Sequence, residues 1–365
     1  MLTFAVTPST ERTADDAREA ILANPGFGKQ FTDHMALATW TDRDGWHDGR
    51  VVPYGPLSLD PATAVLHYAQ EIFEGLKAYR HQDGSVWAFR PQANAQRMIR
   101  SAHRLALPPL PEEDFMASLT ALVEVDRDWV PAYGTGEMSL YLRPFMFASE
   151  AFLGVRPAAH VTYGVIASPA GAYFSGGLSP VTLWISTDFA RAGAGGTGAA
   201  KCGGNYASSL AGQLEGIKHG CDQAVFLDSS TQTYIEELGG MNLFLVYRDG
   251  RIVTPELTGS ILEGVTRSSV LQLAKELGYA PEERRIPIQE WKDGAASGEL
   301  AEVFACGTAA VITPVGELKW DGGSCDHQGN RRDGEPSVAL TLRERLLDIQ
   351  YGRAADELGW MTRLA

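Results

Sequence analysis

The sequence predicts a mixed α/β protein with two domains. Its 365 residues are more than one compact hydrophobic core usually supports, and they suit a pair of domains. Short segments with the composition of strands alternate with longer segments that have helical periodicity. A run of turn-forming residues from Ser168 to Gly177 lies near the midpoint and predicts a linker between the two halves.

These observations divide the chain into three parts. We expect an N-terminal domain over residues 1–168, an interdomain linker over 169–180 and a second domain over 181–365. The first 25 residues show no strong pattern, so we expect a loosely held arm. Mixed elements in two halves favour a ligand that binds in the crevice between them.

The N-terminal half contains helix and hairpin signals. Asp60-Pro61 has the form of an N-cap followed by proline at the first helical position, which predicts a short helix that ends before Ile72. The turn Asp83-Gly84 separates two strand-like segments and predicts a hairpin. The expected elements are hairpin strands at 73–79 and 85–89, helices at about 92–104 and 112–125, and strands at 138–147 and 161–166.

The second half contains further strands and helices. Leu210, Leu214 and Ile217 share one face of a predicted helix at 208–218, which Gly220 ends. The other expected elements are strands at 181–186, 223–227, 242–247 and 251–253, and helices at 266–277 and about 336–349.

Charge and composition exclude several classes of protein. The net charge is -14, from 45 acidic and 31 basic residues, which disfavours binding to nucleic acid or to an acidic membrane surface. No uncharged apolar stretch of about 18 residues is present to cross a membrane. The N-terminus lacks a basic segment followed by an apolar one, so we expect a cytoplasmic protein that binds small molecules.

The four cysteines are Cys202, Cys221, Cys306 and Cys325. They include no C-x-x-C pair, and no histidine lies at a metal-ligand spacing from them. We therefore expect reduced, mostly structural thiols and no metal site.

One glycine-rich segment matches a dinucleotide-binding fingerprint. Gly193 to Gly198 satisfies G-x-G-x-x-G, which requires a tight turn from a strand into a helix whose N-terminus binds the pyrophosphate. The pair Gly203-Gly204 is expected to interrupt any helix at this point. We therefore expect no dinucleotide site, and the absence of G-K-[S/T] excludes a P-loop.

Lys201 lies between two glycine-rich stretches, with Asn205 and Tyr206 just beyond. A lysine amine that attacks a carbonyl must be neutral part of the time, which requires desolvation or a neighbouring positive charge. Small neighbours would let a cofactor approach closely. From the residues alone, a solvated loop lysine is the simpler interpretation.

Two small-residue turns and one helix could bind an anion. Gly264-Val265-Thr266 precedes a predicted helix, and Gly307-Thr308-Ala309 offers a second turn with a hydroxyl donor. Arg97, at helical spacing from Arg100 and Arg104, could reach a phosphate. The simpler interpretations are ordinary connections for the turns and a solvated helix face for the arginines.

Adjacent acids and scattered aromatic residues are further candidates. Glu236 and Glu237 follow a strand-like segment, where neighbouring side chains point in opposite directions, so at most one faces a given site. Core packing is the simplest interpretation of five aromatic residues. They are Phe27, Tyr68, Phe73, Tyr141 and Tyr173.

Ten segments occur in an order that resembles a known family. They are FGKQFTDHM, HYAQEIFEGLKAYR, FRPQANAQRMIRSAHRL, SLYLRPF, SPAGAYFSGG, KCGGNYASS, EELGGMNLF, LEGVTRSSVL, CGTAAVITPVGEL and DIQYGR. From about Phe27 to Gly352 the chain resembles the branched-chain amino acid aminotransferases of pyridoxal-phosphate fold type IV. The resemblance implies a small α+β N-terminal domain, a larger C-terminal domain with a β-barrel-like core, and pyridoxal 5'-phosphate at the domain interface.

The resemblance assigns cofactor contacts to matching positions. Lys201 resembles the lysine that forms the internal Schiff base and later carries a proton between the substrate Cα and the cofactor C4′. Glu237 resembles the carboxylate that bonds the pyridine nitrogen, so Glu236 should face away. Tyr206 resembles the tyrosine that bonds the cofactor O3′. The other implied contacts are Arg97, which resembles the phosphate-binding arginine, and Leu262, Val265, Thr266 and Thr308.

The resemblance also implies a substrate pocket and a partner subunit. The residues that match the family's apolar pocket are Phe27, Tyr68, Phe73, Tyr141, Tyr173 and Ala309. Thr308 and Ala309 would bind the α-carboxylate, and Arg143 would assist with the side-chain carboxylate of glutamate or 2-oxoglutarate. Leu153 and Val155 match residues that reach into the partner subunit's site, which implies a homodimer.

Three positions differ from mammalian relatives of this family. Ala310 and Thr313 stand where those relatives have a C-x-x-C redox pair, so a thiol switch is excluded there. Gly240 replaces a threonine, which removes a hydroxyl near the cofactor.

The implied activity is reversible transamination by a ping-pong mechanism. Leucine, isoleucine or valine gives its amino group to pyridoxal phosphate, and 2-oxoglutarate then accepts it as glutamate. The alternative within the fold is a D-amino acid aminotransferase or an aminodeoxychorismate lyase, which would need a different carboxylate-binding pattern and a shorter N-terminal region. A non-catalytic protein with a phosphate site is disfavoured because Lys201, Tyr206 and Glu237 are all present.

Overall fold

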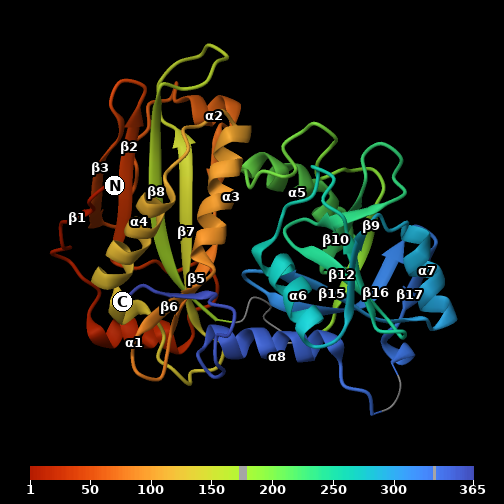
Figure 1. The fold of residues 1–365 in the computed structure, drawn as a ribbon. Helices are drawn as coiled ribbons and strands as arrows, with labels where there is room; N and C mark the ends of the chain where they lie inside the picture. The colour runs from red at the N-terminus through yellow and green to blue at the C-terminus, as the bar shows by residue number, and fades with distance from the viewer. Residues whose placement is uncertain (172–178, 332–333) are drawn as a thin grey trace. The chain divides into compact units, whose positions relative to one another are not determined.

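The computed structural model describes residues 1–171, 179–331 and 334–365 (Figure 1). The chain forms two compact units. Unit 1 comprises Met1–Ser175, Ala200–Gly203 and Asp348–Ala365, and unit 2 comprises Gly176–Ala199 and Gly204–Leu347. The return to unit 1 at Asp348 is absent from the predicted division, which placed all of 181–365 in one domain. Residues 172–178 of the predicted linker lie outside the described residues.

A β-sheet forms the frame of unit 1. Its strands are β1 (Ala5–Val6), β2 (His34–Thr41), β3 (Gly45–Pro53), β4 (Glu71–Phe73), β5 (Leu76–Arg80), β6 (Val86–Phe89), β7 (Ser139–Ala148), β8 (His160–Ala170) and β18 (Met361–Arg363). Their order is β1-β3-β2-β8-β7-β5-β6-β18, with β4 paired to β7. A hairpin forms at the predicted Asp-Gly turn from β5 and β6, but its first strand begins at Leu76, because Phe73 belongs to β4, which pairs with β7. The C-terminal β18 pairs with β6. Strand β8 continues to Ala170, so it extends into the segment predicted as linker.

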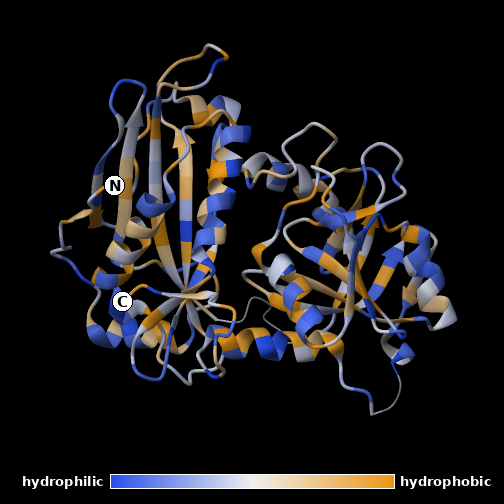
Figure 2. Cartoon of the chain, in the orientation of Figure 1, coloured by the Kyte–Doolittle hydropathy of each residue, from blue (hydrophilic) through white to orange (hydrophobic). Residues whose placement is uncertain are grey.

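The helices of unit 1 are α1 (Asp15–Ala23), α2 (Ala64–Tyr68), α3 (Pro91–Arg104) and α4 (Glu112–Val125), with a short 3-10 helix at Arg127–Trp129. Helix α4 has the predicted bounds. A proline precedes it and three acidic residues occupy its first turn, and both features favour a helix that begins there. Its Phe115, Leu119 and Leu122 are buried, and the helix packs against β2, β3 and β8. The hydrophobic stretches of β7 and β8 complete this core (Figure 2).

The N-terminal arm is held to unit 1, contrary to the expectation of a loose segment. Strand β1 pairs in parallel with β3. The amide of Ser9 donates to Nε2 of buried His34 at 2.8 Å, and the amide of Thr13 donates to the Asp33 carboxylate at 2.9 Å. Their partners lie 20 or more residues away in the sequence, so local patterning could not reveal them.

Unit 2 is built on a second sheet. Its strands are β9 (Val181–Ser186), β10 (Gln223–Leu227), β11 (Ile235–Leu238), β12 (Asn242–Tyr247), β13 (Arg251–Pro255), β14 (Ala280–Arg284), β15 (Leu300–Gly307), β16 (Val311–Trp320) and β17 (Gly323–Asp326). Their order is β11-β10-β9-β16-β15-β12-β13-β14, with β17 paired to β16. The helices are α5 (Gly203–Lys218), α6 (Val265–Glu276), α7 (Ile288–Ser297) and α8 (Val338–Gln350), with a short 3-10 helix at Gln328–Asn330. The first residue of α5 and the last three of α8 belong to unit 1.

Helix α5 differs from the prediction in its start and in its buried face. It begins at Gly203, so the glycine pair opens the helix instead of interrupting it. Leu210, Leu214 and Ile217 are 60%, 59% and 55% exposed, whereas the buried side of the helix carries small residues. A Cβ atom at Gly212 would lie 2.8 Å from the ring of Phe226, so the helix packs too closely on the sheet to bury large side chains.

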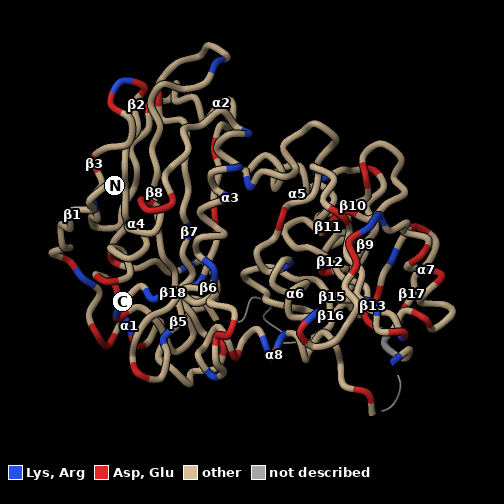
Figure 3. The backbone as a smooth tube through the Cα atoms, viewed as in Figure 1, with Lys and Arg blue, Asp and Glu red and all other residues tan. Residues whose placement is uncertain are grey.

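Charged residues of both signs are interspersed along both units (Figure 3). No helix in the described ranges is long and apolar enough to cross a membrane.

Candidate active site

Lys201 is held by unit 1 through backbone contacts on both sides. Its amide donates to the Ser101 hydroxyl at 2.9 Å, and its carbonyl accepts from the amide of Phe73 at 3.0 Å. Two residues later, the amide of Gly203 donates to the Glu71 carboxylate. The Lys201 Nζ atom lies 4.7 Å from the centroid of the Phe73 ring. Lys201 is therefore half-buried in a fixed loop, unlike an ordinary solvated loop lysine.

Arg97 forms a buried ion pair, so the alternative of a solvated helix face is wrong for this residue. Its Nε and Nη2 atoms donate to Oε1 and Oε2 of Glu74, each at 2.8 Å, and the side chains are 5% and 0% exposed. Burial raises the pKa of Glu74, but the charges of Arg97 and Lys201 and the hydrogen bonds outweigh it and hold that pKa below its ordinary value. Glu74 was not predicted from the sequence. No charge pattern marks it, because its partner lies on a different element.

Four predicted substrate residues gather in unit 1. The rings of Phe27 and Tyr141 meet edge to face, with centroids 5.2 Å apart. The Arg143 guanidinium lies 4.8 Å from the Phe73 centroid and donates to the Tyr141 hydroxyl at 3.1 Å. Three of the four, Phe27, Tyr141 and Arg143, line a cavity of about 150 Å³, and its lining also includes Phe31, which was not predicted. This arrangement combines aromatic side chains with the Arg143 guanidinium.

The remaining substrate candidates of unit 1 lie elsewhere. Tyr68, Leu153 and Val155 are 40%, 66% and 89% exposed, and the Tyr68 hydroxyl donates to the carbonyl of Leu153. None of the three lines the cavity beside Tyr141. Tyr173 lies outside the described residues.

In unit 2, three donors hold the Glu237 carboxylate. Nη1 of Arg191 lies 2.9 Å from Oε1, the amide of Leu262 donates to Oε1 at 2.8 Å, and Asn242 Nδ2 donates to Oε2 at 3.2 Å. Arg191 also donates to the carbonyl of Ser260 at 3.1 Å. Sequence reasoning missed Arg191 and Asn242, since neither carries a local signal for this contact.

Glu236 has a different environment from its neighbour. Its carboxylate accepts the hydroxyl of Ser260, and burial raises its pKa. Both acids lie on β11 and are buried, with Glu236 7% exposed and Glu237 2% exposed. Glu236 therefore points away from the partners of Glu237 without reaching solvent. The different partners of Glu236 and Glu237 agree with the alternation of side chains along a strand.

The turn at Gly264 opens helix α6. Val265 and Thr266 are its buried first residues, and no side chain in the described ranges caps the helix. A Cβ atom at Gly264 would lie 2.1 Å from Oδ1 of Asn242, so only glycine fits there. A helix N-terminus without a side-chain cap suits an anion.

The second turn, at Thr308 and Ala309, joins β15 to β16, and both residues are half-buried. The preceding Gly307 lies against Met241, because a Cβ atom there would be 3.3 Å from that side chain. A Cβ atom at Gly240 would lie 3.4 Å from the Tyr206 ring. Tyr206 therefore neighbours the segment that follows Glu237.

The segment Gly193 to Gly198 does not form a dinucleotide-binding turn. Strand β9 ends at Ser186 and helix α5 begins only at Gly203, so the tight strand-to-helix turn of that motif is not formed between them. Gly198 is needed for packing, since its Cβ atom would lie 2.2 Å from the carbonyl oxygen of Ser260.

The cysteines occur as free thiols. Burial raises the pKa of Cys306 to about 12 and that of Cys325 to about 11, so both remain protonated near neutral pH. In the part of the chain that the structure describes, no three His, Cys, Asp or Glu side chains gather as metal ligands.

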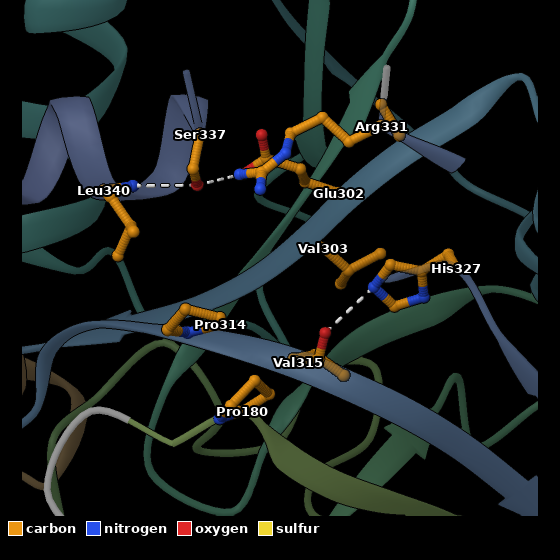
Figure 4. Close-up of a pocket in the computed structure, with 10 residues that line it drawn as sticks. Pro180, Glu302, Val303, Pro314, Val315, His327, Arg331, Ser337 and Leu340 are labelled. Atoms are coloured by element: carbon orange, nitrogen blue, oxygen red, sulfur yellow. Dashed lines mark hydrogen bonds between the residues drawn. The ribbon is translucent and has the colours of Figure 1, made fainter. Parts of the chain in front are cut away.

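A separate cavity of about 250 Å³ lies in unit 2 and contains none of the predicted site residues (Figure 4). Two of its polar side chains have partners within the protein. The Ser337 hydroxyl donates to Glu302 at 2.7 Å, and Nε2 of His327 lies 2.9 Å from the carbonyl oxygen of Val315.

Comparison with known proteins identifies the family. The Amino-transferase class IV family matches residues 71–318. The branched-chain-amino-acid aminotransferase of Mycolicibacterium smegmatis is 56% identical, over 100% of this chain and 98% of that protein. The probable branched-chain-amino-acid aminotransferase of Streptomyces coelicolor is 57% identical, over 100% of this chain and 99% of that protein.

Solved structures confirm the predicted fold class. The Escherichia coli branched-chain amino acid aminotransferase has a TM-score of 0.73 and 28% identity, covering 90% of this chain and 100% of that chain. The branched-chain aminotransferase of the thermophilic archaeon Thermoproteus uzoniensis, solved with norvaline, has a TM-score of 0.72 and 26% identity, covering 90% of this chain and 100% of that chain. The chain therefore belongs to the class IV aminotransferases, among the branched-chain-amino-acid aminotransferases.

Proposed function

We propose that this chain catalyses the reversible, ping-pong transfer of the amino group of leucine, isoleucine or valine to 2-oxoglutarate with pyridoxal 5'-phosphate. The environment of Lys201 carries the proposal. This half-buried lysine makes hydrogen bonds through both its amide and its carbonyl, and its amine lies over the Phe73 ring. The 56% and 57% identity to two branched-chain-amino-acid aminotransferases supports the same activity.

The residues present fit this cofactor. The Lys201 amine would bind its aldehyde carbon, and the buried Glu237 carboxylate would bond its pyridine nitrogen. By resemblance, Arg97 would bind its phosphate. The N-terminus of α6, where Gly264 leaves no room for a Cβ atom, would by itself suit an anion. Tyr206, Leu262, Val265, Thr266 and Thr308 complete the proposed set. When bound, pyridoxal phosphate supplies an electron sink for the carbanion formed at the substrate Cα.

The chain itself would move the proton. Lys201 would be the base that takes the proton from the substrate Cα and holds it on its amine for return to the reacting group. Its fixed backbone restricts where the amine can reach, which contributes to positioning. Arg191 and Asn242 hold the Glu237 carboxylate, which would bond the pyridine nitrogen.

The unit 1 cavity would bind the substrate side chain. Phe27, Phe73 and Tyr141 would enclose an aliphatic group, and burying an isobutyl group contributes roughly 1.5–3 kcal/mol. Arg143 would bind the distal carboxylate of glutamate or 2-oxoglutarate. Thr308 and Ala309 would bind the α-carboxylate. Tyr68 and Tyr173 belong to the same proposed pocket by resemblance alone.

We also propose a cytoplasmic homodimer. Leu153 and Val155 are large apolar side chains that are 66% and 89% exposed, and a partner subunit would cover them. A D-amino acid aminotransferase or aminodeoxychorismate lyase is the alternative, and no observation on the described residues favours either.

A spectroscopic experiment tests the cofactor and the lysine together. Protein purified with pyridoxal phosphate should be yellow, and borohydride should attach the cofactor to Lys201, as peptide mass mapping would show. Lys201→Ala should retain the fold by circular dichroism and lose turnover. A protein that cannot take up the cofactor, or substantial transamination by the variant, would contradict the proposal.

An amino-donor screen with 2-oxoglutarate as acceptor tests the substrate class. Leucine, isoleucine and valine should be the preferred donors, and their order will show which side chain fits best. Preference for D-amino acids would instead support the alternative within the fold.

A further inference from the structure

We infer that Glu74 is a positioning residue that orients the Arg97 guanidinium for the cofactor phosphate. The inference rests on the proposed function, in which Arg97 binds that phosphate. Glu74 follows strand β4, and its backbone amide donates to the carbonyl of Pro144 on β7 at 2.7 Å. The sheet therefore fixes the position from which the carboxylate reaches Arg97.

The contact between the two side chains is bidentate. Nε of Arg97 pairs with Oε1 and Nη2 with Oε2, both at 2.8 Å. Two parallel hydrogen bonds fix the plane of the guanidinium as well as its distance, which a single bond would not do. Because the Nε edge is committed to Glu74, rotation of the guanidinium about its long axis is prevented.

Other groups hold the carboxylate itself in place. Asn94 Nδ2 donates to Oε2 at 2.8 Å, and the amide of Gly75 donates to the same oxygen at 3.2 Å. Asn94 and Arg97 both lie on α3, so the helix contacts the carboxylate at two points. Glu74 is thus a rigid link between the sheet and this helix.

Stability alone does not explain a charged pair at this place. Both side chains are almost fully buried, and replacing a buried ion pair with apolar residues of similar volume is often neutral or stabilising. The Glu74 carboxylate also interacts electrostatically with Lys201. Two cations of the proposed site, Arg97 and Lys201, therefore act on this carboxylate. Orientation of Arg97 gives the pair a role that an apolar pair could not fill.

The test compares two cofactor forms that differ only in the phosphate. Pyridoxal 5'-phosphate and pyridoxal are titrated into the apoprotein, and the dissociation constant of each is measured by visible absorbance. Glu74→Gln should weaken binding of pyridoxal phosphate at least about tenfold, the order found when a contact that supports a metal ligand is removed. Pyridoxal affinity should stay within about twofold, since pyridoxal makes no phosphate contact.

Glu290→Gln is the matched control. Glu290 also forms a bidentate pair with an arginine, Arg284, at 2.9 and 2.6 Å, but outside the proposed site. The same substitution there should change neither dissociation constant. Circular dichroism and thermal unfolding would verify that each variant is folded.

Glu74→Asp provides a second measurement in case Glu74→Gln does not fold. It keeps the charge but shortens the side chain, so it should give a smaller loss that is again confined to pyridoxal phosphate. Equal losses for both cofactor forms, unchanged binding, or tighter binding of pyridoxal phosphate would overturn the inference. Failure of the unmodified protein to bind pyridoxal phosphate would instead contradict the proposed function.

Discussion

Arg191 and Glu237 form an ion pair inside unit 2, with Nη1 2.9 Å from Oε1 and side chains that are 1% and 2% exposed. The pair joins the loop after β9 to strand β11. A buried charge without its partner is costly, so the arginine supports both the fold of unit 2 and the carboxylate proposed to bond the cofactor.

Arg191→Met should therefore lower the free energy of unfolding by about 3–5 kcal/mol, because it leaves the Glu237 carboxylate buried without its cation. Urea denaturation would measure the change. Arg156→Met is a suitable control, since Arg156 pairs with Glu150 at 49% and 24% exposure and such pairs contribute about 0–1 kcal/mol. Equal losses of unfolding free energy in the two variants would show that the buried ion pair stabilises the protein no more than the exposed one.

The two adjacent acids should respond differently to loss of charge. Glu237→Gln removes the carboxylate held by Arg191, so kcat should fall at least tenfold if it bonds the cofactor nitrogen, a loss of about 1.4 kcal/mol. Glu236→Gln should have a smaller effect, because the Glu236 carboxylate bonds the Ser260 hydroxyl instead of the groups that hold Glu237. Steady-state kinetics at neutral pH would rank them, and the reverse order would place the wrong acid at the cofactor.

Gly75→Ala should impair substrate binding more than folding. A Cβ atom at Gly75 would lie 2.0 Å from the Tyr141 hydroxyl, so the tyrosine side chain, which packs against Phe27, must shift. Overpacking of this kind costs roughly 1–3 kcal/mol. We expect a higher KM for branched-chain donors. Gly55→Ala, where no atom of the described residues lies within 4 Å, should leave KM unchanged.

Stability at low pH should depend on Asp228. Burial raises its pKa, but hydrogen bonds from the backbone amides of Tyr234, Thr233 and Thr231 and from the Ser230 hydroxyl outweigh burial and lower that pKa well below the ordinary value. The folded state therefore binds this proton less readily than the unfolded state, so the stabilisation is present above the ordinary value of 3.8.

The stabilisation from Asp228 should be lost as the pH falls through and below 3.8. Asp228→Asn should lower stability at neutral pH and weaken the dependence of the unfolding midpoint on pH in this acidic range. Thermal unfolding between about pH 2 and 6 would measure both effects. An unchanged slope would mean that other carboxyl groups dominate acid unfolding.

Local signals predicted the elements that depend on local interactions. Helix α4 and the hairpin of β5 and β6 follow from a proline with acidic first-turn residues and from an Asp-Gly turn. Helix α5 was predicted with the wrong start and its apolar face proved exposed. The close approach of Gly212 to Phe226 decides which face is buried, and that contact depends on a strand elsewhere in the chain.

The residues of the candidate site likewise fall into those that the sequence identified and those that only the structure revealed. Lys201, Arg97 and Glu237 were named from quoted segments of the sequence, whereas Glu74 and Arg191, which hold two of them, were not. Ion pairs between distant positions have no periodicity for a single sequence to reveal.

The sequence by itself determined the family, the mixed α/β class and the identity of most chemically active residues, because these depend on residue types in a fixed order. Only the tertiary structure decided what each residue contacts. It shows that Glu74 pairs with Arg97 and that the N-terminal arm donates a hydrogen bond to His34. The physical reason is that a buried polar group must find a partner, and folding supplies that partner from any part of the chain.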